Sequence, residues 1–265
     1  LLLLKLPEPP NLIDRESNLW RDLVEPARHP SFGRFIVFAC FWNFALQFGS
    51  AFLFLYCLKE LHIPPFLVML YWSLQGLGTM LTSSMWGRFA DRYGHRPVLK
   101  VCVAYKPILF LGFLFVTPEN AYWLLPLLLL PDGMVNGGYT LAIQGYMLTM
   151  SPQRNRSMFI AAQTGLSGIC GGLSMMVAGA LLESTKSLHV NVFGMTWGHY
   201  HLIFFICMTL RATSVWFAHR IHEPGAVRAR MLLRTLVEEG PVRALLFPVG
   251  FFRNWRPDDN DKSDA

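Results

Sequence analysis

The sequence has few charged residues. Asp, Glu, Lys and Arg make up 15% of its 265 residues and hydrophobic residues 53%, whereas a typical soluble domain is about a quarter charged. The charges that do occur collect in short blocks between long apolar runs, and a soluble helical protein would spread them along its helix faces. This pattern argues against a soluble protein and predicts one whose solvent is lipid.

Cysteines and recognisable catalytic motifs are also scarce. The five cysteines all fall in apolar runs, and an odd number so placed argues against a disulfide framework. The sequence contains no HExxH or GxSxG motif, phosphate-binding loop or metal-ligand spacing, so we expect neither an enzyme nor a cofactor or metal site. The net charge is +6, but the basic residues form no stripe interleaved with aromatics, which argues against a nucleic-acid partner.

Six apolar runs are long enough to cross a bilayer, which takes about 20 residues of helix. They cover residues 35–58, 65–86, 98–116, 121–150, 158–182 and 200–218. We therefore predict an all-α membrane protein with six transmembrane helices. We divide it into a cytoplasmic linker with a possible interfacial helix (1–33), the six-helix bundle (34–220), and a tail that is amphipathic and then disordered (221–265). A mobile cytosolic tail is an equally good interpretation of the amphipathic part.

Lysine and arginine are distributed unevenly among the connecting segments. Of the 23 such residues, only Lys59, Lys106, Lys186 and Arg211 fall outside the stretches before the first span and after the second, fourth and sixth spans, with Lys100 at the start of the third span counted in the segment before it. Cytoplasmic segments are enriched in these residues. We therefore expect a multi-pass protein of the plasma or inner membrane with both termini in the cytoplasm.

The segment between the second and third predicted spans reads GRFADRYGHRP, from Gly87 to Pro97. A glycine at position 87 would let a neighbouring helix approach closely, and Gly94 would permit the turn that reverses the chain. Asp91 would place a carboxylate at the membrane face, where it could meet a helix N-terminus or a guanidinium. Pro97 suits the first turn of the next helix. An ordinary basic cytoplasmic turn is the alternative interpretation.

This segment resembles the signature loop of the major facilitator superfamily, in both its letters and its position between the second and third helices of a six-helix half. The resemblance implies a conformational latch formed by the residues Gly87, Asp91, Arg92, Gly94 and Arg96. It differs at His95, where the family usually has Arg or Lys, and at Phe89, where Leu is commoner. The glycine-rich fourth and fifth spans look like the tenth and eleventh helices of the complete transporter, which implies the C-terminal half and a missing N-terminal half as partner. The opening Leu run, which lacks an initiator methionine, agrees with a chain cut from something longer.

Three charged residues, Lys106, Asp132 and Arg211, lie about 9 to 12 residues into their predicted spans and so near mid-membrane. A charge at this depth costs about 2.5 to 3.5 kcal/mol on insertion scales and indicates a function by default. A carboxylate and one of the cations could pair there. The family architecture, in which the first, second, fourth and fifth helices line the cavity, favours Asp132 as a proton-coupling or substrate-binding group; a buried structural pair is the alternative. It assigns Lys106 and Arg211 to snorkelling or pairing.

Amide side chains in the spans are further candidates for substrate or proton-coupling sites. Asn136 shares a helix face with Asp132, and Asn43 and Gln47 share another among aromatic residues. Interhelical hydrogen bonding explains such amides equally well. The weaker candidates of the same kind are Gln75, Gln144 and Gln163.

Taken together, these features predict secondary active transport of a small solute by alternating access, with the bilayer, an unknown solute and protons as partners. The alternative is a six-helix membrane scaffold or fragment that transports nothing.

Overall fold

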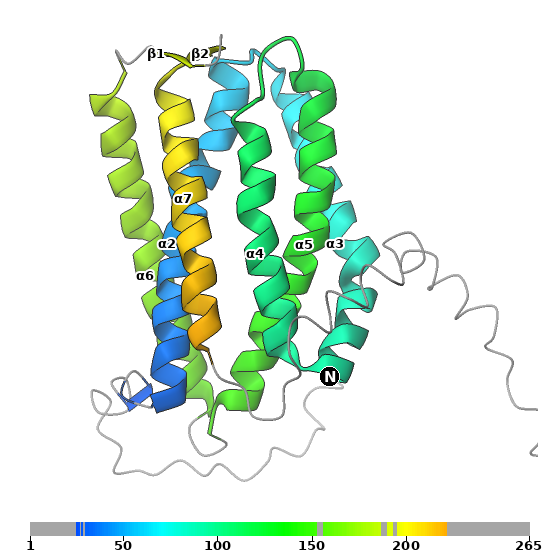
Figure 1. Ribbon diagram of the computed structural model, residues 1–265, viewed down its shortest axis with the longest axis vertical. Coiled ribbons are helices and arrows are strands. Elements are labelled where there is room, and N and C mark those ends of the chain that lie inside the picture. The colour runs from blue at the N-terminus through cyan, green and yellow to red at the C-terminus, as the bar shows by residue number, and fades with distance from the viewer. Residues whose placement is uncertain are drawn as a thin grey trace, which may run out of the picture.

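The computed structural model describes residues 25–26, 28, 30–152, 156–186, 190–192 and 195–221. Within this part, six long helices run up and down side by side (Figure 1). They are α2 (Pro30–Lys59), α3 (Pro65–Tyr93), α4 (His95–Phe113), α5 (Ala121–Met150), α6 (Arg156–Ser184) and α7 (His199–Arg220). Two short antiparallel strands, β1 (Val190–Val192) and β2 (Met195–Trp197), connect α6 to α7. The possible interfacial helix before residue 30 and the tail after residue 221 lie outside the described residues, apart from residues 25, 26 and 28.

The six helices coincide with the six predicted spans, but several ends differ by two to seven residues; the first helix, for example, begins at Pro30 instead of residue 35. The second helix continues to Tyr93 instead of ending near residue 86, and the third ends at Phe113 instead of residue 116. The strands were not predicted. We call the lower end of the bundle in Figure 1, where α3 ends and α4 begins, the basic end, and the opposite end the hairpin end.

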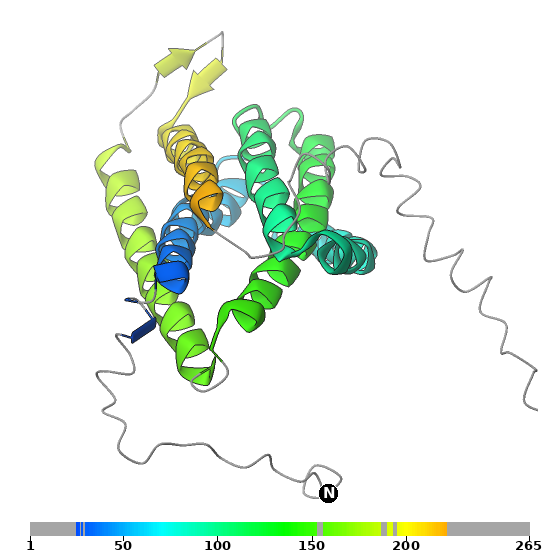
Figure 2. The same cartoon turned by 60° about the horizontal axis from the view of Figure 1, so that its bottom comes forward.

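The helices pack in two groups of three with the same pattern. In one group α5 packs against both α3 and α4, and in the other α2 packs against both α6 and α7. The two sets of contacts correspond: α5 takes the place of α2, α3 that of α6, and α4 that of α7, each three helices apart in the chain. The two groups meet where α4 packs against α7. Figure 2 shows the outcome, with α3 and α6 on opposite flanks of the bundle. We call these groups the α5 group (α3, α4, α5) and the α2 group (α2, α6, α7).

The apolar core is divided into two clusters along the length of the bundle. The cluster toward the basic end includes Phe35, Trp86 and Tyr146, and the cluster toward the hairpin end includes Tyr56 and Phe204. Each of the three charged residues in the spans lies, along its own helix, between members of the two clusters. The core therefore has a polar layer between two apolar layers.

The contact between α3 and α5 is close because glycines line it. A Cβ atom placed on Gly133 would lie 2.0 Å from the carbonyl oxygen of Gln75, and one on Gly78 would lie 2.4 Å from the carbonyl oxygen of Leu130. No side chain fits at such distances, so the two backbones can touch only where glycine stands. This approach brings side chains of α3 within reach of the backbone carbonyls of α5.

A proline in α5 supplies one such carbonyl. Pro126 has no N–H group, so the carbonyl of Tyr122, four residues earlier, loses its usual helical donor. The hydroxyl of Tyr71 on α3 donates to that carbonyl over 3.1 Å. A carbonyl without a donor would be costly in lipid, and Tyr71 of α3 supplies the donor.

By length and composition alone, α2, α6 and α7 are long and apolar enough to cross a membrane. The interiors of the other three helices include the polar residues Gln75 in α3, Lys106 in α4 and Asp132 in α5. Buried polar residues occur in both groups, among them Thr82, Lys106 and Asp132 in the α5 group and Gln163, Ser174 and Arg211 in the α2 group.

Candidate functional site

Two of the charged residues predicted at mid-membrane form an ion pair. The ammonium of Lys106 on α4 lies 2.8 Å from Oδ1 of Asp132 on α5. Relative exposure is 2% for the lysine side chain and 11% for the aspartate side chain. Removing one member of such a buried pair leaves an uncompensated charge, which typically costs about 3–5 kcal/mol. The pair therefore fixes the contact between α4 and α5.

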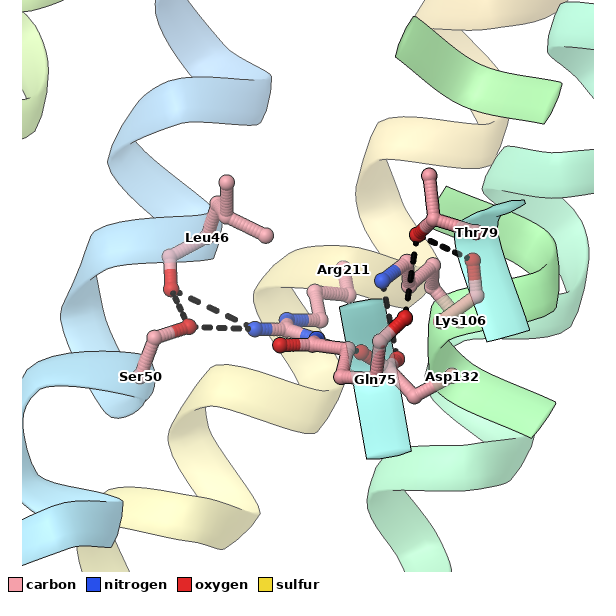
Figure 3. A network of polar contacts seen from close by, with 8 residues as sticks. Leu46, Ser50, Gln75, Thr79, Lys106, Asp132 and Arg211 are labelled. Atoms are coloured by element: carbon pink, nitrogen blue, oxygen red, sulfur yellow. Dashed lines mark hydrogen bonds and ion pairs between the residues drawn. The ribbon is translucent and has the colours of Figure 1, made fainter. Parts of the chain in front are cut away.

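The second carboxylate oxygen of Asp132 is held by α3. Nε2 of Gln75 donates to Oδ2 of Asp132 over 2.5 Å, so both carboxylate oxygens are bonded, one by an ammonium and one by an amide. One carboxylate thereby ties together the three helices of the α5 group (Figure 3). If Asp132 took up a proton, the attraction that holds Lys106 and Gln75 would weaken.

The remaining intramembrane charge, Arg211 on α7, has neutral partners. Its Nη2 donates to Oγ of Ser50 over 3.0 Å and to the carbonyl of Leu46 over 3.3 Å, both on α2. Its guanidinium also lies 4.0 Å from the ring centre of Phe110. Arg211 is 2% exposed, so its head group stays in the bundle and does not snorkel to an interface.

The amides of α2 lie at a helix contact. Asn43 and Gln47 both face Gly171 of α6, and Nδ2 of Asn43 donates to the carbonyl of Ala39 in its own helix over 3.2 Å. Both side chains are half-buried. The shared face that the spacing predicts is present, and it faces α6.

The other predicted amides are placed apart from the ion pair. Gln163 is buried on α6, where its Nε2 lies 3.5 Å from Oγ of Ser167. Gln144 is exposed near the end of α5, and Asn136 is half-buried one turn beyond Asp132. Among the predicted site residues, the structure joins Asp132, Lys106 and Gln75 by direct hydrogen bonds.

The signature segment is mostly helix. Residues from Gly87 to Tyr93 extend α3, and only Gly94, with φ of 93°, separates α3 from α4. The predicted turn is therefore at Gly94, as expected, but it is a single residue. At Gly87 a Cβ atom would make an ordinary van der Waals contact with Leu141 of α5 at 3.8 Å, so this glycine is not required for helix packing in this conformation.

The charged residues of the segment lie at the basic end, some exposed and some half-buried. Asp91 and Arg92 are exposed, and the guanidinium of Arg92 lies 5.3 Å from the ring centre of Tyr93. Nη2 of Arg96 donates to the carbonyl of His219 over 3.4 Å and so links the start of α4 to the end of α7. The exposed carboxylate of Asp91 is in a position to meet a partner from outside these helices.

Sequence reasoning missed several polar residues of the α3–α5 contact. Oγ1 of Thr79 donates to the carbonyl of Gly133, while Oγ1 of Thr82 and Nε1 of Trp86 donate to the carbonyl of Met134. With Gln75, these residues follow a spacing of four, three and four, which puts them on one helix face. That spacing is visible in the sequence and could have revealed the face.

Comparison with known proteins gives one finding. The profile of the Major Facilitator Superfamily matches residues 30–253, a range that includes all six described helices and the signature segment. No curated protein and no solved structure matches the chain. Apolar helices of membrane-spanning length, together with this match, indicate a protein embedded in a membrane. The chain belongs to the major facilitator superfamily, a superfamily of membrane transporters.

Proposed function

We propose that this chain forms one six-helix bundle of a secondary transporter, the C-terminal half of a twelve-helix protein, and that it moves a small solute by alternating access. The observation that carries the proposal is the buried Asp132 carboxylate, bonded to Lys106 and Gln75 inside a bundle of this superfamily. A charge placed at mid-membrane is costly and is usually kept because it acts on a substrate or a coupling ion.

Asp132 is the proposed proton-coupling or substrate-binding group. Protonation removes the charge that attracts Lys106, so a proton taken up from one side of the membrane would loosen α3 and α4 from α5. Loss of that proton on the other side would restore the three-helix contact. Such an ion-dependent contact is the kind of two-state element that can couple a gradient to a rocking motion.

The second bundle is proposed to face the flanks of this one. The exposed apolar side chains include Phe66 and Met80 on α3 and Ile169 and Met176 on α6. On α6, a Cβ atom added to Gly165, Gly168 or Gly172 would meet nothing within 4 Å. These faces are available to lipid and to a partner bundle, which is why both are proposed as partners.

The basic end is proposed to lie in the cytoplasm of a cell with the chain in its plasma or inner membrane. Arg88, Arg92, Arg96 and Lys100 all lie near this end, in the last turns of α3 and the first turns of α4, which agrees with the positive-inside tendency. Labelling intact cells with an impermeant maleimide tests it. Glu119→Cys, at the hairpin end, should be labelled and Arg92→Cys should not; the unmodified chain measures the background from its five cysteines. The reverse pattern would invert the topology.

Transport is tested in liposomes loaded with a pH-sensitive dye. If the native reading frame encodes six further spans, the complete protein should couple proton movement to uptake of some member of a panel of small solutes, and Asp132→Asn should abolish the coupling. The present chain alone should insert but not transport. Transport by this chain reconstituted as a monomer would contradict the proposal that it is one half.

A further inference from the structure

The polar layer carries more positive than negative charge. Among the described Lys, Arg, Asp and Glu residues, the buried ones are Lys106, Arg211 and Asp132, which together have a net charge of +1. Every other described acidic residue is exposed: Glu25, Glu60, Asp91, Glu119 and Glu183. Because a buried charge without a counter-charge is unfavourable by several kcal/mol, this surplus calls for an explanation.

The surplus is located at Arg211. Its partners in the described part of the chain are the hydroxyl of Ser50, the carbonyl of Leu46 and the neutral thiol of Cys207, and its Nε is buried without a hydrogen-bond partner there. Guanidinium groups recognise carboxylates through two parallel N–H donors. The unused Nε–H leaves Arg211 with donor capacity that neither Ser50 nor Leu46 takes up.

Lys106 adds spare donors nearby. Its ammonium has three N–H groups, and among the described residues one of them is used, by Asp132. Arg211 is close enough to Lys106 to act on it electrostatically. In Figure 3 the side chains of Arg211, Lys106, Gln75 and Asp132 reach toward the same region from four different helices.

The residues that border the region are less buried than the two cations. Gln75 and Ser50, which border it on α3 and α2, are both half-buried, whereas the two cations are each 2% exposed. An incoming ion would therefore meet a polar amide and a hydroxyl before it reached the charges. A cation would be repelled by the net charge, and an anion would be attracted.

We propose that Arg211 and Lys106, with Ser50 and Gln75 at the border, form a binding site for a small anion that neutralises the surplus charge. The ligand is a monoanion of limited size, either the carboxylate group of a solute or an inorganic ion such as chloride. This deepens the proposed function by giving the transported solute a negative charge, and for that part it rests on the proposed function. The binding site itself can be tested without transport.

The test is thermal unfolding of the purified chain in detergent, at constant ionic strength, with sodium acetate or sodium chloride replacing a bulky sulfonate, sodium HEPES. A ligand that binds only the folded state raises the midpoint, and at ten times its Kd the rise is on the order of 3–5 °C for a chain of this size. We expect such a rise in at least one of the two salts. A rise in acetate alone indicates a carboxylate ligand, and a rise in chloride alone indicates an inorganic ion.

Variants assign the effect to the site. Arg211→Gln should abolish the rise, and Arg211→Lys, which keeps the charge, should retain part of it. The matched control is Arg220→Gln on the same helix, where the exposed guanidinium lies 3.8 Å from the ring centre of Trp216, and it should keep the full rise. If Arg211→Gln does not fold, Ser50→Ala provides the second variant and should reduce the rise.

Several results would overturn the anion site. One is an unchanged midpoint in both salts, and another is an equal rise in Arg211→Gln and the unmodified chain. A third is stabilisation by alkaline pH in place of anions, which would mean that Lys106 gives up its proton to neutralise the layer. If the protein binds anions but transports nothing, the anion site stands and the transport proposal is wrong. If it transports neutral solutes and anions have no effect on it, the transport proposal stands and the anion site is wrong.

Discussion

The α5 group and the α2 group share one packing pattern, and each contains one buried cation, Lys106 on α4 or Arg211 on α7. They differ in what the central helix offers that cation. α5 provides a carboxylate, Asp132, at 2.8 Å, whereas α2 provides the hydroxyl of Ser50 and a backbone carbonyl. The same arrangement of helices is thus held by an ion pair in one group and by neutral acceptors in the other.

The groups also differ in how closely their helices approach. The α3–α5 contact has backbone against backbone at Gly78 and Gly133, with four α3 side chains donating to α5 carbonyls. At the α2–α6 contact, Ser174 donates to the carbonyl of Phe44, and Gly171 faces the side chain of Gln47. We infer that the helices of the α5 group tolerate less change at their contacts than those of the α2 group. The same substitution should therefore lower the free energy of unfolding more in the α5 group.

The largest effect should come from breaking the ion pair. Asp132→Leu should lower the free energy of unfolding by about 3–5 kcal/mol, because it leaves Lys106 charged and buried. Lys106→Met should cost a similar amount, and the double variant Lys106→Met/Asp132→Leu should recover most of it. Unfolding of the four proteins in detergent gives the coupling energy. A double variant no more stable than the single ones would show that the pair does not act as a unit.

The next effect tests the closeness of the helices. Gly133→Ala should cost about 1–3 kcal/mol, because the new methyl group collides with the carbonyl of Gln75. Gly165→Ala on α6, where the space is open, should be neutral or stabilise the helix by up to about 1 kcal/mol. Comparing the two variants in thermal unfolding separates the clash at Gly133 from the general effect of Gly→Ala in a helix, and equal effects would contradict a close contact at Gly133.

Removing the other cation should have a smaller and opposite effect. In the bulky-sulfonate buffer, Arg211→Met should raise the free energy of unfolding by about 1 kcal/mol, since it eliminates a buried charge that has no acidic partner among the described residues. This contrasts with the loss expected for Lys106→Met. A loss of equal size in both variants would mean that Arg211 has a counter-charge of its own.

The smallest effect concerns a single hydrogen bond. Tyr71→Phe should lower the free energy of unfolding by less than about 1 kcal/mol, because the carbonyl of Tyr122 loses its donor. Tyr105→Phe, at an exposed position of α4, is the matched control and should change little. If both variants behave alike in thermal unfolding, Pro126 is tolerated in α5 without help from α3.

Much of this arrangement could be predicted from the sequence, because lipid imposes a simple length rule on apolar helices. The rule fails at Trp86, where the apolar run stops and the helix does not. Charged residues end a membrane span but are good helix formers in water, so α3 continues beyond the predicted end, to Tyr93.

The ion pair could be anticipated only in part. The cost of charge in lipid identified Lys106, Asp132 and Arg211 as residues of interest. Which cation meets the carboxylate depends on the rotation of each helix about its axis, and apolar residues surround these helices too evenly for the sequence to fix that rotation. The position of Gln75 beside Asp132 depends on the glycine contact between α3 and α5, which joins segments far apart in the sequence.

The one-residue junction at Gly94 has a mechanical consequence. With no slack between them, α3 and α4 cannot slide independently, and a displacement of the last turn of α3 must carry the first turn of α4 with it. Lys106 lies deep in α4, several helical turns beyond the first residue of that helix, His95. An α-helix is stiff over such a length. A displacement of the exposed Asp91 would therefore be transmitted to Lys106 as a movement along the axis of α4.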